Sequence, residues 1–212
     1  RREGQTVAVD WPAARGRFDL AAREGEFHIR SDVRGFGLAI EDVLRVLAFE
    51  LSLVDDVLLL HAAAVGPVDA PWVDLFAGRS GVGKTTLTER LVATGEEAVS
   101  DDLVFVGMRN GRPAALRTPF KGSTNAPRER RRESEIRAIA LLRKAGAPSC
   151  RWLEGAEKLS RLLTAVVRYR PLTVSEGADV ARLAAAISSP VCELGLTLDA
   201  DPRRVLGTPP PP

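Results

Sequence analysis

Apolar and polar side chains alternate in the first thirty residues, with the period of half-buried β-strands. Gly16 and Gly25 interrupt this alternation, and the pattern predicts a small antiparallel β unit over residues 5–31. After the glycines at 35 and 37, the apolar spacing becomes helical and predicts a helix over residues 38–53. The apolar positions concerned are Val7, Val9, Phe18, Leu20, Phe27 and Ile29, followed by Leu38, Val43, Leu44, Leu47, Phe49 and Leu51.

The centre of the chain carries short, nearly continuous apolar runs of the kind found in buried strands. Turn-forming residues at 66–71 separate the first two runs, so we expect an antiparallel hairpin there. Gly95 is well placed to end the helix that follows. In chain order we predict strands over 58–65 and 73–77, a helix over 84–94, and a strand over 97–107 that contains Ser100, Asp101 and Asp102.

The second half begins with a polar, basic stretch over residues 112–135, which we expect to be irregular. Four consecutive prolines predict an extended tail over 208–212. The elements predicted between them are strands over 136–142 and 151–153, helices over 154–169 and 176–188, and a strand over 191–198. Hairpins mixed with helices predict an α/β fold with a mixed sheet, and the lack of a repeat argues against solenoids and propellers.

The length of 212 residues fits one domain with a small extension. We expect a β extension over 1–34 packed on the core, the main domain over 35–207, and the proline tail. The 45% apolar content excludes a disordered chain, and no run approaches the ~18–20 apolar residues of a membrane span. Two cysteines, Cys150 and Cys192, are too few for a disulfide framework, so a cytoplasmic location is expected.

The net charge of +2 hides an asymmetry along the chain. Residues 1–106 carry 11 basic and 18 acidic side chains, whereas residues 107–212 carry 19 and 10. A basic half indicates an anionic ligand or partner. The alternative is a general excess of arginine, which supplies 26 of the 30 basic residues.

Much of the positive charge lies in the basic loop expected over residues 109–137. Such a loop is able to place cations over a triphosphate or to dock an acidic protein or peptide; the alternative is a solvated loop. Nucleic acid is a weaker candidate, because aromatic residues that would stack on bases are almost absent from this part of the chain, with Phe120 in the loop and Trp152 beyond it. The residues singled out are Arg117, Lys121, Arg128, Arg130, Arg131, Arg132 and Arg137, with a possible ligand loop over 118–124.

The sharpest chemical signal is a run of eight residues that fills the pattern G-x-x-x-x-G-K-[ST] of phosphate-binding loops. Its small residues let backbone N–H groups face phosphate oxygens, and the following helix adds the positive end of its dipole. In this interpretation Lys84 reaches the β- and γ-phosphates of ATP, the Thr85 hydroxyl binds Mg²⁺, and Thr86 adjoins them. The run, called the glycine-rich loop below, consists of Gly78, Arg79, Ser80, Gly81, Val82, Gly83, Lys84 and Thr85.

Asp101 and Asp102 follow Lys84 by seventeen and eighteen residues. A helix, a turn and a short strand would return this pair to the glycine-rich loop. Consecutive strand residues point to opposite faces, so the two carboxylates have different roles unless the strand ends there. One would hold the metal while the other accepts a proton; the alternative is one metal-holding Asp beside a solvated neighbour. His61, in an apolar strand next to the loop, is either a core residue or part of the site.

These residues together resemble the HPr serine kinase/phosphorylase family, whose nucleotide fold is shared with ATP-dependent phosphoenolpyruvate carboxykinase. The similar stretch begins at Leu58–Leu59–Leu60–His61–Ala62, contains the glycine-rich loop, and ends at Ser100–Asp101–Asp102–Leu103–Val104. The resemblance covers about fifty residues closely and the rest of the chain only in the order of its elements.

The resemblance implies an ATP- and Mg²⁺-dependent kinase that phosphorylates a Ser or similar hydroxyl of a protein or peptide. Asp102, His61 and Lys84 would then be catalytic, and Thr85 and Asp101 would hold the metal. Family members have a Glu where Thr86 stands, and their glycine-rich recognition stretch has no match here. A peptide acceptor other than HPr is therefore favoured, and a homo-oligomer is plausible. The alternatives are a P-loop ATPase and a nucleotide-binding regulatory module.

Overall fold

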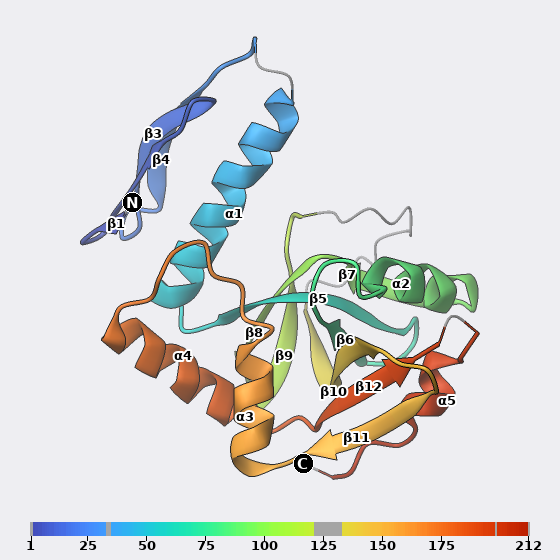
Figure 1. The fold of residues 1–212 in the computed structure, drawn as a ribbon. Helices are drawn as coiled ribbons and strands as arrows, with labels where there is room; N and C mark the ends of the chain where they lie inside the picture. Colours follow the sequence, from blue (N-terminus) through green and yellow to red (C-terminus); the bar gives the residue numbers. More distant parts are fainter. Residues whose placement is uncertain (1, 33–34, 121–132, 198, 212) are drawn as a thin grey trace. The chain divides into compact units, whose positions relative to one another are not determined.

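The computed structural model describes residues 2–32, 35–120, 133–197 and 199–211 (Figure 1). The chain divides into two units, one formed by Arg1–Asp56 with Arg168–Pro171 and the other by Val57–Val167 with Leu172–Pro212. The α/β class with a mixed sheet is confirmed, because helices are interspersed with strands that pair both parallel and antiparallel. None of the described helices is long and apolar enough to cross a membrane.

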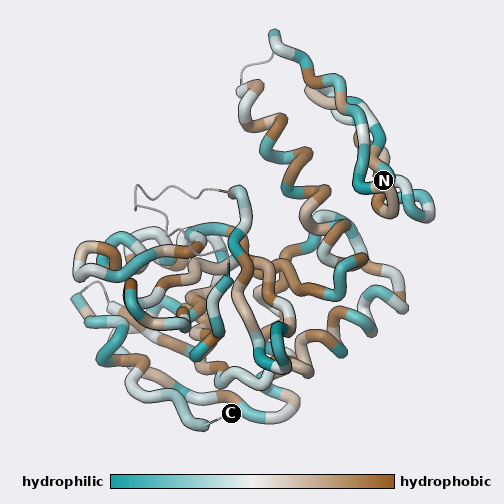
Figure 2. The backbone as a smooth tube through the Cα atoms, turned by 180° about the vertical axis from the view of Figure 1, so that it is seen from behind, coloured by the Kyte–Doolittle hydropathy of each residue, from teal (hydrophilic) through white to brown (hydrophobic). Residues whose placement is uncertain are grey.

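The first unit contains the predicted antiparallel sheet and the predicted helix. The sheet consists of β1 (Arg2–Glu3), β2 (Thr6–Asp10), β3 (Ala14–Asp19) and β4 (Glu24–Ile29), paired in chain order. The helix α1 (Phe36–Val54) follows, and Figure 2 shows hydrophilic and hydrophobic positions alternating along it. Its apolar stripe supplies Val43 and Leu47 to a core that also contains Val7, Val9 and Leu20.

This shared core corrects the domain boundary expected after residue 34. Helix α1 belongs with the sheet, because Val43 and Leu47 bury their side chains against the strands. The short segment 168–171 also belongs to the first unit. There the Arg170 guanidinium donates to both carboxylate oxygens of the buried Glu50, at 2.7 and 2.9 Å. A buried carboxylate requires such a partner, and this pairing between distant positions was not apparent from the sequence.

The second unit is built on a mixed sheet around β5. Its strands are β5 (Leu58–Pro67), β6 (Trp72–Ala77), β7 (Glu96–Ser100), β8 (Leu103–Arg109), β9 (Arg112–Arg117), β10 (Glu133–Lys144), β11 (Ser149–Leu153) and β12 (Val191–Leu196). The order is β11-β12-β10-β6-β5-β8-β9, with β7 also on β5. Strand β10 runs parallel to β6 and β12, and the other pairs are antiparallel. Because β9 also pairs with β10, the strands β5, β6, β8, β9 and β10 close into a five-stranded barrel.

The predicted hairpin is present, since β5 and β6 pair with Ala62 opposite Ala77. Two expectations about neighbouring segments are wrong. The single strand expected over 97–107 is interrupted at Asp101 and Asp102, so that β7 and β8 pair with different parts of β5. The stretch 112–135, expected to be irregular, contributes β9 and the start of β10, whose pairing supplies the backbone hydrogen bonds of both segments.

In its described residues the second unit also contains four helices: α2 (Lys84–Ala93), α3 (Gly155–Leu163), α4 (Val174–Ala186) and α5 (Pro202–Leu206). Leu87 and Leu91 of α2 and Leu206 of α5 bury their side chains in one core with Phe76 and Leu194 of the sheet. The helix expected over 154–169 ends at Leu163, and residues 165–167 instead bond to the edge of β5. Helix α5 was not predicted.

Candidate functional site

The glycine-rich loop connects the end of β6 to the start of α2, which is the strand–loop–helix order that its motif requires. Gly81 and Gly83 adopt φ values of 76° and 111°, a region that other residues enter only with strain. Gly83 is the N-cap of α2 and provides no side-chain cap. The first N–H groups of a helix lack partners within it, so this helix end suits an anion.

Lys84 lies across the loop and is 7% exposed. Its ammonium donates hydrogen bonds to the carbonyl oxygens of Gly78 and Arg79, at 2.8 and 3.2 Å. Burial lowers the pKa of Lys84, and the nearby negative charge of Asp102 opposes this shift. The cation is therefore held by the loop at the mouth of the helix, where a phosphate oxygen is able to replace one of these carbonyls.

Asp101 and Asp102 lie in the break between β7 and β8. The hydroxyls of Ser100 and Thr118 both donate to the carbonyl oxygen of Leu103, at 2.6 and 2.7 Å. Both hydroxyl-bearing residues are buried. The backbone of Asp102 is fixed to β5 because its carbonyl accepts from the N–H of Ala62, at 3.0 Å. The strand ends at this point, and both residues line the same cavity.

His61 lies on β5 beside this turn. Its Nδ1 is 3.9 Å from Oδ1 of Asp102, and its side chain is 35% exposed. Its backbone carbonyl accepts from the N–H of Gly78, at 3.4 Å, which joins β5 to the start of the glycine-rich loop. The core interpretation of His61 therefore does not hold: the strand buries its neighbours and leaves the imidazole facing the cavity.

These residues surround one cavity of ≈320 Å³, which we call the carboxylate pocket. Of the predicted site residues, Gly78, Arg79 and Val82 do not line it. Gly78 and Arg79 contribute the carbonyls bonded to Lys84, and Val82 lines a neighbouring cavity. The lining residues are His61, Ser80, Gly81, Gly83, Lys84, Thr85, Thr86, Asp101 and Asp102.

The described parts of the basic segment do not form the expected loop. Lys121, Arg128 and the arginines at 130–132 lie outside the described residues, as does most of the possible ligand loop over 118–124. The start of that loop is packed inward, since Thr118 and Phe120 are 2% and 4% exposed. The Thr118 hydroxyl thus bonds to Leu103, the residue that directly follows Asp101 and Asp102. Only this contact between distant positions reveals its role.

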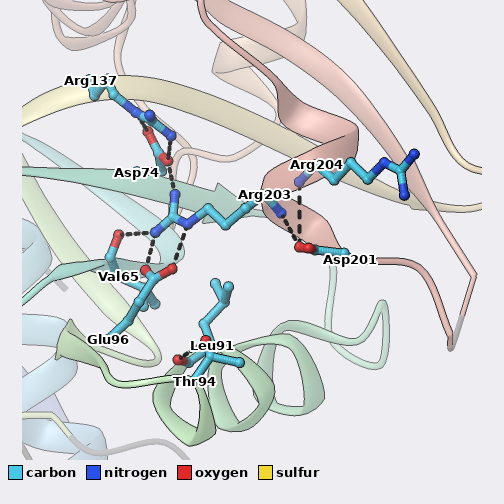
Figure 3. A network of polar contacts seen from close by, with 9 residues as sticks. All are labelled: Val65, Asp74, Leu91, Thr94, Glu96, Arg137, Asp201, Arg203 and Arg204. Carbon is cyan, nitrogen blue, oxygen red and sulfur yellow. Dashed lines mark hydrogen bonds and ion pairs between the residues drawn. The ribbon is translucent and has the colours of Figure 1, made fainter.

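Arg137 joins a buried ionic network (Figure 3). Its guanidinium pairs with Asp74 of β6, which is fully buried, and lies 4.0 Å above the ring of Trp72. Arg203 of α5 pairs with Asp74 as well and also with Glu96 of β7. The network fastens α5 to two strands, so Arg137 is structural rather than part of a ligand loop.

The chain matches no family model and no curated protein. Among solved structures, the chain is similar in fold to the HPr(Ser) kinase/phosphatase from Coxiella burnetii. The TM-score is 0.40 and the sequence identity 13%, over 65% of this chain and 85% of that chain.

Proposed function

We propose that the chain is an ATP-dependent kinase that transfers the γ-phosphoryl group to a Ser or similar hydroxyl of a protein or peptide. The observation that carries the proposal is the carboxylate pocket. A buried lysine, the hydroxyl of Thr85 and two adjacent carboxylates line the same cavity at the start of a helix. Phosphoryl transfer needs these groups together, because its catalysis is mainly positioning and charge neutralisation.

The residues present fit a magnesium ion. Thr85, Asp101 and Asp102 offer the oxygen ligands that Mg²⁺ prefers, and Mg²⁺ keeps several waters and phosphate oxygens as its remaining ligands. The described residues contain no cluster of three or more His, Cys, Asp or Glu side chains that would bind a metal alone. When bound with ATP, the ion would neutralise charge on the phosphates. We assign Thr85 and Asp101 to hold it.

In the proposed reaction, the acceptor oxygen forms a bond to the γ-phosphorus while the bond between that phosphorus and the β,γ-bridging oxygen breaks. The acceptor proton passes to Asp102, and ADP leaves with the bridging oxygen. Lys84 and the N–H groups of the loop stabilise the phosphate oxygens. His61 lies close enough to Asp102 for a small movement to bring the two into hydrogen-bond distance, where it would orient the carboxylate.

The test is transfer of label from γ-labelled ATP to Ser- and Thr-containing peptides in the presence of Mg²⁺. We expect Asp102→Asn to reduce labelling by at least ~100-fold, the usual contribution of a general base. Asp69→Asn is the matched control, because Asp69 is exposed in the β5–β6 turn. If Asp102→Asn labels the peptide at the same rate as the wild type, the proposal is contradicted. Release of phosphate without labelled peptide would favour the ATPase alternative.

A further inference from the structure

A second cavity of ≈570 Å³ adjoins the carboxylate pocket, and we call it the side chamber. The two cavities share Gly81, Gly83 and Thr86, so they meet over the first turn of α2. The volume of the side chamber lies in the range of ordinary small-molecule sites. A ligand extending along the glycine-rich loop would therefore leave the carboxylate pocket and enter this chamber.

The linings of the two cavities differ in chemistry. The carboxylate pocket holds Asp101, Asp102 and Lys84. The side chamber is lined by aliphatic and cationic residues, and its described lining contains no carboxylate. The aliphatic residues are Val82, Leu87, Leu142 and Leu196, and the cations are Arg90, Arg143 and Lys144. Such a wall suits a flat, uncharged ring next to an anion.

The polarity of the loop decides which end of a nucleotide enters the chamber. In this motif the lysine reaches the β- and γ-phosphates, the adjacent hydroxyl binds the metal, and the backbone holds the α- and β-phosphates. Lys84 and Thr85 lie in the carboxylate pocket, whereas Thr86 borders both cavities. The γ-phosphate end therefore lies beside the carboxylates, and the α-phosphate end is directed toward the chamber.

The walls of the chamber are already in place. Arg90 donates to the carbonyl of Ala200 at 2.8 Å, which ties α2 to the segment before α5. The ionic network of Arg203 holds α5 against β6 and β7 (Figure 3), and Pro202 of α5 lines the chamber. The pairing of β10 with β12 fixes Leu142 and Leu196 next to each other in the lining. A preformed cavity binds without the entropy loss of ordering its walls.

We infer that the side chamber binds the base and ribose of the nucleotide, against the aliphatic surface that Leu142 and Leu196 form on one face of the paired strands β10 and β12. This inference rests on the proposed function, because it takes its direction from a triphosphate on the glycine-rich loop. The chamber supplies affinity for the nucleoside, and the carboxylate pocket supplies the chemistry at the γ-phosphate.

The experiment compares ATP with inorganic tripolyphosphate by calorimetry in the presence of Mg²⁺. Tripolyphosphate has the same phosphate chain and no nucleoside. We expect Leu142→Ala and Leu196→Ala to weaken ATP binding about 10-fold each, the effect of removing a few methylene contacts, and to change tripolyphosphate binding by less than about twofold. Val92→Ala is the matched control, because Val92 packs on the same core as both leucines but does not line the chamber.

The outcomes separate the inference from the proposed function. If wild type binds ATP no more tightly than tripolyphosphate, the chamber contributes nothing and the inference is wrong while the phosphate site stands. If Leu142→Ala weakens the binding of ATP and of tripolyphosphate equally, the substitution acts on the structure of the whole site, and the inference is also wrong. A rise in the KM for the peptide with unchanged ATP affinity would assign the chamber to the acceptor instead. If wild type binds neither ligand, the proposed function fails as well.

Discussion

Asp74 offers the sharpest test of how the second unit is held together. Its carboxylate is fully buried on β6 and pairs with both Arg137 and Arg203. Asp74→Asn keeps the shape of the side chain and removes its charge. Arg203 then keeps its pairing with Glu96, whereas Arg137 loses the carboxylate it pairs with, so one positive charge in a partly desolvated site loses its compensation.

The magnitude follows from the burial of the partners. Removing one member of a buried ion pair costs about 3–5 kcal/mol. The side chains of Arg137 and Arg203 are 28% and 21% exposed, so water relieves part of the excess charge and the lower end applies. We expect the free energy of unfolding to fall by about 3 kcal/mol, or about 6–12 °C in Tm for a unit of this size.

Urea denaturation of the full chain measures this change, with Asp69→Asn as the control for an exposed carboxylate. The control should change stability by about 0.5 kcal/mol or less. Arg137→Met should cost less in the Asp74→Asn background than in the wild type, with a coupling of at least about 1 kcal/mol, because it removes the uncompensated cation. The reasoning would be refuted if Asp74→Asn lowered the free energy of unfolding by less than about 1 kcal/mol. It would also be refuted if the effects of Asp74→Asn and Arg137→Met were additive in the double variant.

Two further predictions concern the carboxylate pocket. Thr118→Val removes one of the two hydroxyl donors to the Leu103 carbonyl, so the free energy of unfolding measured in urea should fall by about 1 kcal/mol. Thr118→Ser keeps the hydroxyl and should retain most of that stability. Equal stability of the two variants would contradict a stabilising role for this hydrogen bond. Burial lowers the pKa of Lys84 in the folded protein. At a pH between this lowered pKa and the ordinary pKa of lysine, the unfolded chain binds more protons than the folded chain. The contribution of Lys84 to the free energy of unfolding therefore rises with pH in this window. The stability difference between wild type and Lys84→Met should therefore shift in favour of wild type as the pH rises through that window, and a shift in the opposite direction would contradict the assignment.

The elements that the sequence predicts correctly are those decided by local pattern. The alternation in residues 5–31, the helical spacing after Gly37 and the turn at 66–71 each depend on neighbours within a few positions. The strand, loop and helix around the glycine-rich loop belong to this class, because its glycines carry their own conformational requirement. A signal for α5 was also present: Asp201 followed by Pro202 is a typical helix start, and the Asp201 carboxylate does accept from the N–H of Arg203.

The errors fall where distant segments decide the structure. The domain boundary depends on Val43 and Leu47 packing against strands more than twenty residues earlier. Strand β9 acquires its order from pairing with both β8 and β10, and its own short sequence contains a proline and no β-branched or aromatic residue that would indicate a strand. Asp74 inside an apolar strand did signal a buried ion pair, but nothing near it in the sequence identifies Arg203 as the partner.

The break at Asp101 and Asp102 joins these two kinds of information. An unbroken strand would have turned one carboxylate away from the glycine-rich loop, as its alternation requires. The hydroxyl of Thr118, fifteen residues beyond Leu103, helps to hold the chain in the interrupted form, in which both carboxylates line the pocket. The local motif thus supplies the groups that would bind phosphate, whereas the barrel, through β9 and Thr118, sets where the second carboxylate lies. A kinase needs both contributions, because an acceptor hydroxyl is deprotonated only by a base that lies beside the phosphate it attacks.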